Sequence, residues 1–297
     1  MRILLDAKDL INVVEHSKPV KLSELDDWLR ARNARLVYSL GNIRGLAAPL
    51  AIDSSHLPRI KEYIGQLEGL PHCFIGSDIN LIELRSALRC FEASKEYEPV
   101  NPFVPRFDYV FPRFANPKKL YYPMWDSVPD LWRACPHIFK PQHKFHEILA
   151  FAMSIDREKP VARRLPVEVP AETIIETLMD KMSVTKERAT EVASWINDGG
   201  PFRCPAMWLA RALGSAMSQN RTYSARRDDT FDMAEMWAIP YVEAATVDRT
   251  MLDWFSRARR NIGRKGGMVN ESARVFKSLQ DLMAASPVAE GAINGDV

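Results

Sequence analysis

Short apolar runs that alternate with helix-patterned segments restrict this chain to a small number of folds. Residues 2–6 (RILLD) and 35–40 (RLVYSL) are apolar, and hydrophobic residues recur at helical spacing after each run. Runs of this length are typical of buried parallel strands, and the segments between them of crossover helices. The repeated order of strand and helix predicts an α/β fold, in which helices cover both faces of a parallel sheet.

The same patterns predict the remaining elements. A short apolar run at residues 73–75 predicts a further strand, and residues 241–255 are expected to be the last strand–helix unit. Pro240 ends a helix that begins near Asp229. Further helices are predicted at residues 7–16, from Ser23, from Asn42, and at 57–67, 79–93, 145–154, 171–182, 186–197 and 206–218.

The composition changes after Tyr97, and this change sets the predicted domain boundaries. Nine prolines lie from Pro99 to Pro141, together with many aromatic residues. Proline lacks a backbone N–H, so such a stretch does not form a run of regular elements. The aromatic residues indicate an ordered excursion packed on the domain, with stacking on RNA bases as the alternative use. We predict one domain in two halves (1–95 and 203–284), an insertion (96–202) and a flexible tail (285–297).

Composition and motifs exclude several classes of protein. The net charge is only +2, so any nucleic-acid-binding surface must be local. The four cysteines include no CxxC pair, which argues against a zinc site and fits free thiols in a reducing cytoplasm. No apolar run approaches the roughly 20 residues of a membrane helix. We therefore expect a cytoplasmic protein that does not contact a membrane.

Acidic residues stand at the ends of predicted elements that are far apart in the sequence. Asp6 ends the first strand and Asp248 ends the last one, while Asp229 and Asp232 are three residues apart on one helix face. The carboxyl ends of parallel strands meet at one edge of a sheet, so adjacent first and last strands would bring Asp6 and Asp248 together. Asp6 could instead cap the following helix, and Asp229 and Asp232 could be a helix cap with a favourable charge in its first turn.

The order of these residues resembles the PIN (PilT N-terminus) nuclease family. That family pairs an acid at the end of strand 1 with acids that open a late helix and flank a late strand. The opening RILLDAKDLI resembles the family's first strand and helix, and the resemblance covers residues 1–95 and 203–262. The late pattern is represented here by Asp229, Asp232, Pro240, Tyr241, Glu243, Thr246, Asp248 and Arg249. The resemblance implies a three-layer α/β fold and a metal-dependent endonuclease, most often an endoribonuclease.

The resemblance also implies the composition of the active site. Hard cations such as Mg²⁺ or Mn²⁺ take oxygen ligands, and one or two of them activate water and neutralise charge on a phosphodiester. Six residues are assigned to this site on the resemblance: Asp6, Asp229 and Asp248 as catalytic metal ligands, and Asp232, Glu243 and Thr246 as supporting residues.

One departure from the family pattern leaves two functions open. The family usually carries a glutamate in the helix after the second strand, where this chain has Gly45. Glu83 is the candidate substitute, from a neighbouring helix. Without a substitute, the chain would be a catalytically weakened PIN-like module that binds RNA or protein.

Basic residues flank the acidic stretch. They are predicted to contact nucleic-acid phosphates, with a solvated helix face as the alternative for residues 257–265. RNA is the implied substrate, and DNA is the alternative. The resemblance further implies a toxin or defence effector restrained by an inhibitory protein partner, and a homodimer. The basic residues assigned to nucleic-acid binding are Arg226, Arg227, Arg249, Arg257, Arg260, Arg264 and Lys265.

Overall fold

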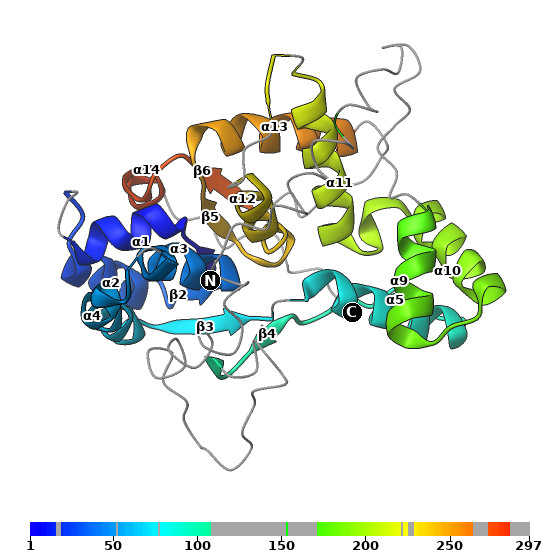
Figure 1. Cartoon of the computed structure of the whole chain (residues 1–297), viewed down its shortest axis with the longest axis horizontal. Helices are drawn as coiled ribbons and strands as arrows, with labels where there is room; N and C mark the ends of the chain where they lie inside the picture. The colour runs from blue at the N-terminus through cyan, green and yellow to red at the C-terminus, as the bar shows by residue number, and fades with distance from the viewer. Residues whose placement is uncertain are drawn as a thin grey trace, which may run out of the picture.

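The structure is a computed structural model whose described residues form an α/β fold. A six-stranded, mostly parallel sheet is flanked by helices, an arrangement compatible with three layers (Figure 1). This confirms the predicted fold class at that level. Among the described helices, none combines the length and hydrophobicity that a membrane span requires. The described residues are 1–15, 19–51, 53–76, 78–107, 153, 171–220, 222–224, 229–263 and 273–285.

The sheet brings strands from both ends of the chain to its centre. The strands are β1 (Arg2–Leu4), β2 (Arg35–Tyr38), β3 (His72–Ile75), β4 (Phe103–Val104), β5 (Ala244–Thr246) and β6 (Arg274–Phe276). Their order is β4-β3-β2-β1-β5-β6, in which β4 pairs antiparallel with β3 and the other pairs are parallel. Leu4 of β1 faces Ala245 of β5. The carboxyl ends of β1 and β5 therefore lie side by side.

One face of the sheet is covered by helices from the N-terminal part of the chain and by the last described helix. These are α1 (Ala7–Val14), α2 (Leu22–Ala31), α3 (Leu40–Ala47), α4 (Leu57–Glu68) and α14 (Leu279–Ala284). The short 3₁₀ turns η1 (Ala48–Ala51) and η2 (Ser54–His56) join α3 to α4. Successive strand residues point to opposite faces, and Ile3, Leu36 and Phe74 pack against this helix layer. Figure 1 shows α1 to α4 gathered together, with α14 beside α1.

The opposite face is covered by helices from the second half of the chain and by α5 (Ile79–Glu92). Leu4, Val37 and Ala245 point to this side. One continuous hydrophobic cluster runs from these strand residues to α9 and α10, which the sequence had assigned to the insertion. The other helices are α9 (Ala171–Met182), α10 (Lys186–Asp198), α11 (Pro205–Ser218), α12 (Asp229–Met236) and α13 (Arg249–Gly263), with the 3₁₀ turns η6 (Gly200–Phe202) and η7 (Ile239–Tyr241).

The structure corrects the prediction at the end of the chain. Residues 241–255 were expected to be the last strand–helix unit, but β6 and α14 form a further one. Both elements are short, and β6 begins with a charged residue, so neither has a clear periodic pattern. The α2 helix begins at Leu22 with Lys21 at its N-cap, two residues before Ser23. The helix predicted at 145–154 lies outside the described residues except for Met153, as do 108–152, 154–170 and the tail from residue 286.

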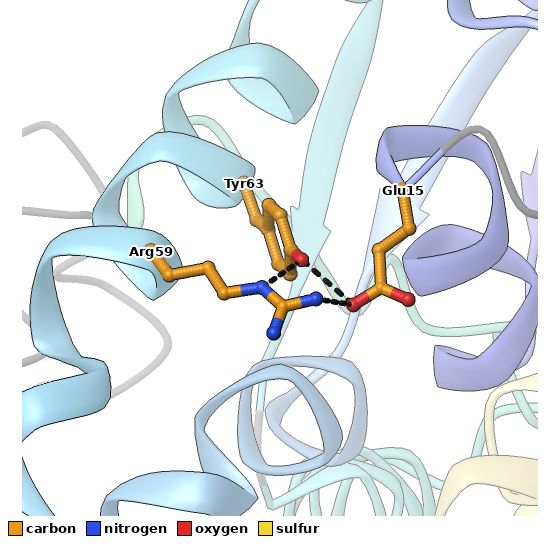
Figure 2. Close-up of polar contacts among 3 residues, drawn as sticks. All are labelled: Glu15, Arg59 and Tyr63. Carbon is orange, nitrogen blue, oxygen red and sulfur yellow. Dashed lines mark hydrogen bonds and ion pairs between the residues drawn. The ribbon is translucent and has the colours of Figure 1, made fainter.

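A small polar cluster fixes the far end of α1. Tyr63 of α4 donates a hydrogen bond of 2.7 Å to the Glu15 carboxylate, and the Arg59 guanidinium lies 2.5 Å from the same oxygen (Figure 2). Arg59 also donates to the Tyr63 hydroxyl. Exposed ion pairs contribute little stability, so the cluster mainly fixes how α1 lies on α4. At the opposite end of α1, Asp6 is the N-cap residue.

Candidate active site

Asp6 joins the end of β1 to the end of β5. Its backbone N–H donates to the Thr246 hydroxyl at 2.9 Å, and Thr246 is buried as the last residue of β5. The Asp6 side chain caps α1, because one carboxylate oxygen accepts a 2.7 Å hydrogen bond from the Lys8 N–H. The Thr246 hydroxyl therefore holds the backbone of Asp6 in place, while its predicted role in supporting a metal site stays a prediction.

Asp248 occupies the equivalent position after β5. One of its carboxylate oxygens accepts a 2.7 Å hydrogen bond from the Met251 N–H in the first turn of α13. Asp6 and Asp248 are thus both helix caps, and for Asp6 this is the structural alternative that the sequence left open. Each cap bond uses one carboxylate oxygen, and the second oxygen of each carboxylate can accept a hydrogen bond or bind an ion.

The two strand-end acids influence each other. Burial raises the pKa of Asp6 above its ordinary value, and the neighbouring Asp9 and Asp248 carboxylates raise it further. The hydrogen bond from the Lys8 N–H and the charge of Lys8 oppose this shift. Like charges destabilise the ionised form, so β1 and β5 place their acids within electrostatic reach.

The α12 helix supplies two further acids to the same edge. Asp232 and Glu235 line a small cavity together with Asp6 and Thr246. Burial raises the pKa of Glu235 well above its ordinary range, the Asp6 and Asp232 carboxylates add to this, and the Arg44 guanidinium opposes it. Sequence reasoning missed Glu235. Its position three residues after Asp232 was the available signal, because residues at that spacing share a helix face.

Two glycines of α3 allow close contacts with the neighbouring helices α12 and α1. A Cβ atom at Gly41 would overlap the side chain of Glu235, so the acid occupies space that a larger residue would take. A Cβ atom at Gly45 would overlap the Cβ of Ala7 in α1. Gly45 therefore allows α1 and α3 to approach closely, and a glutamate there would push the helices apart. Glu235 of α12 lies against α3, the helix in which the family pattern would carry a glutamate.

Two predicted supporting residues lie elsewhere. Glu243 precedes β5, so it sits at the amino end of that strand, where its carboxylate accepts a hydrogen bond from the backbone of Arg2. Strand direction is the reason: an acid before a parallel strand and one after it reach opposite edges of the sheet. Glu83 is fully buried in α5 and accepts hydrogen bonds from two N–H groups in the first turn of α11, and from the Tyr241 hydroxyl. Neither residue lines the cavities beside Asp6.

The predicted basic residues are only partly described. Arg249 begins α13 and lines a cavity beside Asp6 and Asp248. Arg257 forms an ion pair of 2.8 Å with Asp253 on the same helix, and Arg260 is exposed. This pairing agrees with the solvated-face alternative for that part of α13. The residues outside the description are Arg226, Arg227, Arg264 and Lys265, and the side chain of Asp229, whose backbone opens α12.

The acids at this edge suit a hard cation in their chemistry. Asp6, Asp232, Glu235 and Asp248 offer oxygen donors only, as Mg²⁺ and Mn²⁺ prefer. Within the described part of the chain, no three His, Cys, Asp or Glu side chains are grouped so that they could hold one ion together. Mg²⁺ commonly keeps several waters and needs only one or two direct carboxylates, so the donor set still fits that ion.

Comparison with known proteins does not assign a family. The chain matches no protein-family model, and searches of curated proteins and of solved structures likewise give no match. Its function therefore has to be inferred from the chain's own residues.

Proposed function

We propose that this chain is a PIN-like endonuclease that uses Mg²⁺ or Mn²⁺ to hydrolyse phosphodiester bonds, with RNA as its substrate. One observation supports this most strongly: β1 and β5 are adjacent parallel strands, so Asp6 and Asp248 come from distant parts of the chain to one edge. Burial raises the pKa of Asp6 and the Asp9 and Asp248 carboxylates add to this, so an ionised Asp6 is costly at this edge without a cation.

The residues at this edge have distinct roles in the proposal. Asp6 and Asp248 hold the ion directly or through water, while their cap bonds to the Lys8 and Met251 N–H groups fix the two carboxylates. Thr246 fixes the Asp6 backbone. When bound, the ion lowers the pKa of a coordinated water and neutralises charge that develops on the phosphate. Carboxylates held by short cap bonds are pre-organised, which favours catalysis because little rearrangement is then needed.

Glu235 takes the place of the glutamate missing from α3. It lies against Gly41 of that helix and lines one cavity with Asp6 and Asp232. Burial raises its pKa and the Asp6 and Asp232 carboxylates add to this, a repulsion that a bound cation would offset. Asp232 and Glu235 are one helical turn apart, so α12 presents both carboxylates on the side that faces Asp6.

Cleavage of a labelled single-stranded RNA tests the proposal. Wild type should cut in Mg²⁺ or Mn²⁺ and not in EDTA. Asp6→Asn should lower the rate by at least about 100-fold, since even residues that only orient metal ligands are worth about 10–100-fold. Asp26→Asn is the matched control, because Asp26 pairs with Arg30 on the exposed side of α2. Equal rates for wild type and Asp6→Asn, or no cleavage of RNA or DNA with either ion, would overturn the proposal.

A second variant tests the assignment of Glu235. Glu235→Gln keeps the shape of the side chain and removes its charge, so the protein should fold while the rate falls by roughly 10- to 100-fold. Higher Mn²⁺ concentrations should partly restore the rate. A rate equal to wild type at limiting Mn²⁺ would remove Glu235 from the site and leave the role of Asp6 standing.

The alternative is a PIN-like module that binds RNA or protein without cutting. Two observations favour it: the glycine at position 45, and the lack of a three-ligand group among the described side chains. RNA binding by wild type without cleavage in either ion would support this alternative. An inhibitory partner and a homodimer remain predictions from the resemblance.

A further inference from the structure

A second and larger cavity opens at the same edge of the sheet. Its volume is about 270 Å³, and it lies outside the carboxyl ends of three neighbouring strands, β1, β5 and β6. Asp6 and Asp248 line it after the first two strands, and Lys277 and Ser278 line it after the third. Crevices at this edge of an α/β sheet are the usual position of ligands.

The lining of this cavity combines cations with an apolar wall. Lys8, Arg249 and Lys277 are exposed residues at its rim, each from a different connection between a strand and a helix. Buried valines and one leucine form the wall: Val13, Val20, Val247 and Leu279. The neutral polar side chains of Asn12, Ser278 and Gln280 and the Asp9 carboxylate complete the lining.

We propose that this cavity binds one nucleotide of a single-stranded nucleic acid, next to the phosphodiester that reaches Asp6 and Asp248. The volume is at the lower limit of small-molecule sites, so it fits one nucleotide and excludes a base-paired duplex. The three cations bind its phosphate, and the apolar wall packs against its base. This inference rests on the proposed function, because it takes the scissile phosphate to lie at the acidic residues.

The rim cations are positioned for this role by the structure around them. Lys8 lies in the first turn of α1 and Arg249 in the first turn of α13, beside the two acids that cap those helices. Lys277 stands 3.9 Å from the Asp281 carboxylate, and both side chains are largely exposed, so this pair is weak. A phosphate can therefore compete for Lys277. The cations also offset the repulsion that the site acids exert on an approaching polyanion.

The wall predicts how selective this subsite is. None of the residues that line this cavity is aromatic, so the base packs on aliphatic side chains, which do not distinguish one base from another. The side-chain amides of Asn12 and Gln280 carry both donors and acceptors, the groups that can pair with a base edge. We expect weak base preference, which replacement of Gln280 would alter more than it alters overall affinity.

Fluorescence anisotropy with a labelled single-stranded RNA of mixed sequence tests the subsite, with Ca²⁺ in place of Mg²⁺. Lys8→Gln/Lys277→Gln should weaken binding by about 10-fold, and the slope of log affinity against log salt should become shallower by about 1.4, at about 0.7 per lost phosphate contact. The control Lys181→Gln/Lys186→Gln makes the same change of charge on exposed residues of α9 and α10, and it should leave affinity unchanged.

A second pair of variants tests the cavity itself. Gln280 is exposed at its mouth, so Gln280→Trp can fill the opening without disturbing the core, and Gln280→Ala is the size control. Gln280→Trp should weaken binding, whereas Gln280→Ala should bind as wild type does on mixed sequences. The same RNA annealed into a duplex should bind more weakly than the single strand. Single-stranded DNA of the same sequence, measured in parallel, shows whether the subsite distinguishes RNA from DNA.

The outcomes separate this inference from the proposed function. Unchanged affinity and salt slope for the double lysine variant would overturn the subsite, even if Mn²⁺-dependent cleavage is lost in Asp6→Asn. Lysine-dependent binding by a protein that never cleaves would keep the subsite and overturn the nuclease. Equal binding of duplex and single strand would also overturn the subsite.

Discussion

Two sets of desolvated carboxylates in this molecule have opposite surroundings. Glu83 is fully buried, and its neighbours are hydrogen-bond donors: two N–H groups in the first turn of α11 and the Tyr241 hydroxyl. Asp6 and Glu235 have other carboxylates as neighbours, which raise their pKa values. Burial alone therefore does not mark a functional site. The groups around a buried acid distinguish its role. Hydrogen-bond donors satisfy the carboxylate and make it structural, whereas neighbouring carboxylates leave it able to bind a cation.

The largest effect on stability is expected from removing the structural acid. Glu83→Ala leaves three buried donors without their acceptor and should lower the free energy of unfolding by about 4 kcal/mol. Glu92→Ala is the control, because Glu92 is exposed on the same helix. Chemical denaturation of both variants measures the difference. A loss below about 1 kcal/mol for Glu83→Ala would remove the distinction between the two sets of acids.

The pH dependence of stability should show the same residue. Burial raises the pKa of Glu83 from 4.5 to about 7, outweighing its three hydrogen bonds. The folded state thus holds this proton more tightly, and the resulting stability is present below pH 4.5 and lost as pH rises through about 7. Wild type should lose up to about 3 kcal/mol relative to Glu83→Gln between these values, at about 1.4 kcal/mol per pKa unit.

Denaturation in EDTA at a series of pH values measures this difference. Subtracting the Glu83→Gln curve removes the contributions of Asp6 and Glu235, because both proteins contain them. A flat difference between pH 4.5 and 8 would show that the Glu83 pKa is not raised.

Metal ions should separate the two sets of acids directly. Mn²⁺ at ten times its dissociation constant should stabilise wild type by about 1.4 kcal/mol. Glu83→Gln should keep this gain, since its partners are hydrogen-bond donors, and Asp6→Asn should lose most of it. Thermal unfolding with and without Mn²⁺ gives both values. Equal gains in Asp6→Asn and wild type would place the ion elsewhere.

The smallest effect on stability is expected from the glycine beside Glu235. Gly41→Ala displaces the Glu235 side chain from its Cγ outward and should cost about 1 kcal/mol, whereas Gly45→Ala meets the Cβ of Ala7, forces α1 away from α3 and should cost about 2 kcal/mol. Only the Gly41 variant should also weaken Mn²⁺ binding. A larger stability loss at Gly41 than at Gly45 would contradict the described packing.

The sequence predicted much of the fold because the strands and long helices carry clear periodic patterns. Residues 171–182 were predicted as a helix with the limits observed for α9. Adjacency of the first and last predicted strands also followed from pattern and family resemblance, and the structure confirms it for β1 and β5. Short elements failed, since the two residues of β4 and three of β6 give no measurable alternation.

The candidate site was predicted less completely than the fold. Strand ends identified Asp6 and Asp248, because parallel strands direct their carboxyl ends to one edge. Glu243 precedes the strand that Asp248 follows, so strand direction places it at the opposite edge, although the family resemblance had assigned it to the site. The structural role of Glu83 involves a hydrogen bond from Tyr241, 158 positions away, and no local sequence pattern predicts such a contact. The place of Glu235 depends on its contact with Gly41 of α3, which the sequence alone does not predict.

The central position of β1 has a consequence for how the protein is made. β1 is translated well before one of its two partners, β5, which contains residues 244–246. Until that stretch leaves the ribosome, one edge of β1 has no partner and is open to misassociation with other chains. The same delay keeps Asp6 apart from Asp248, so a nascent chain holds only part of the acidic edge. Whatever activity this edge has, it arises only after residues 244–248 have been synthesised.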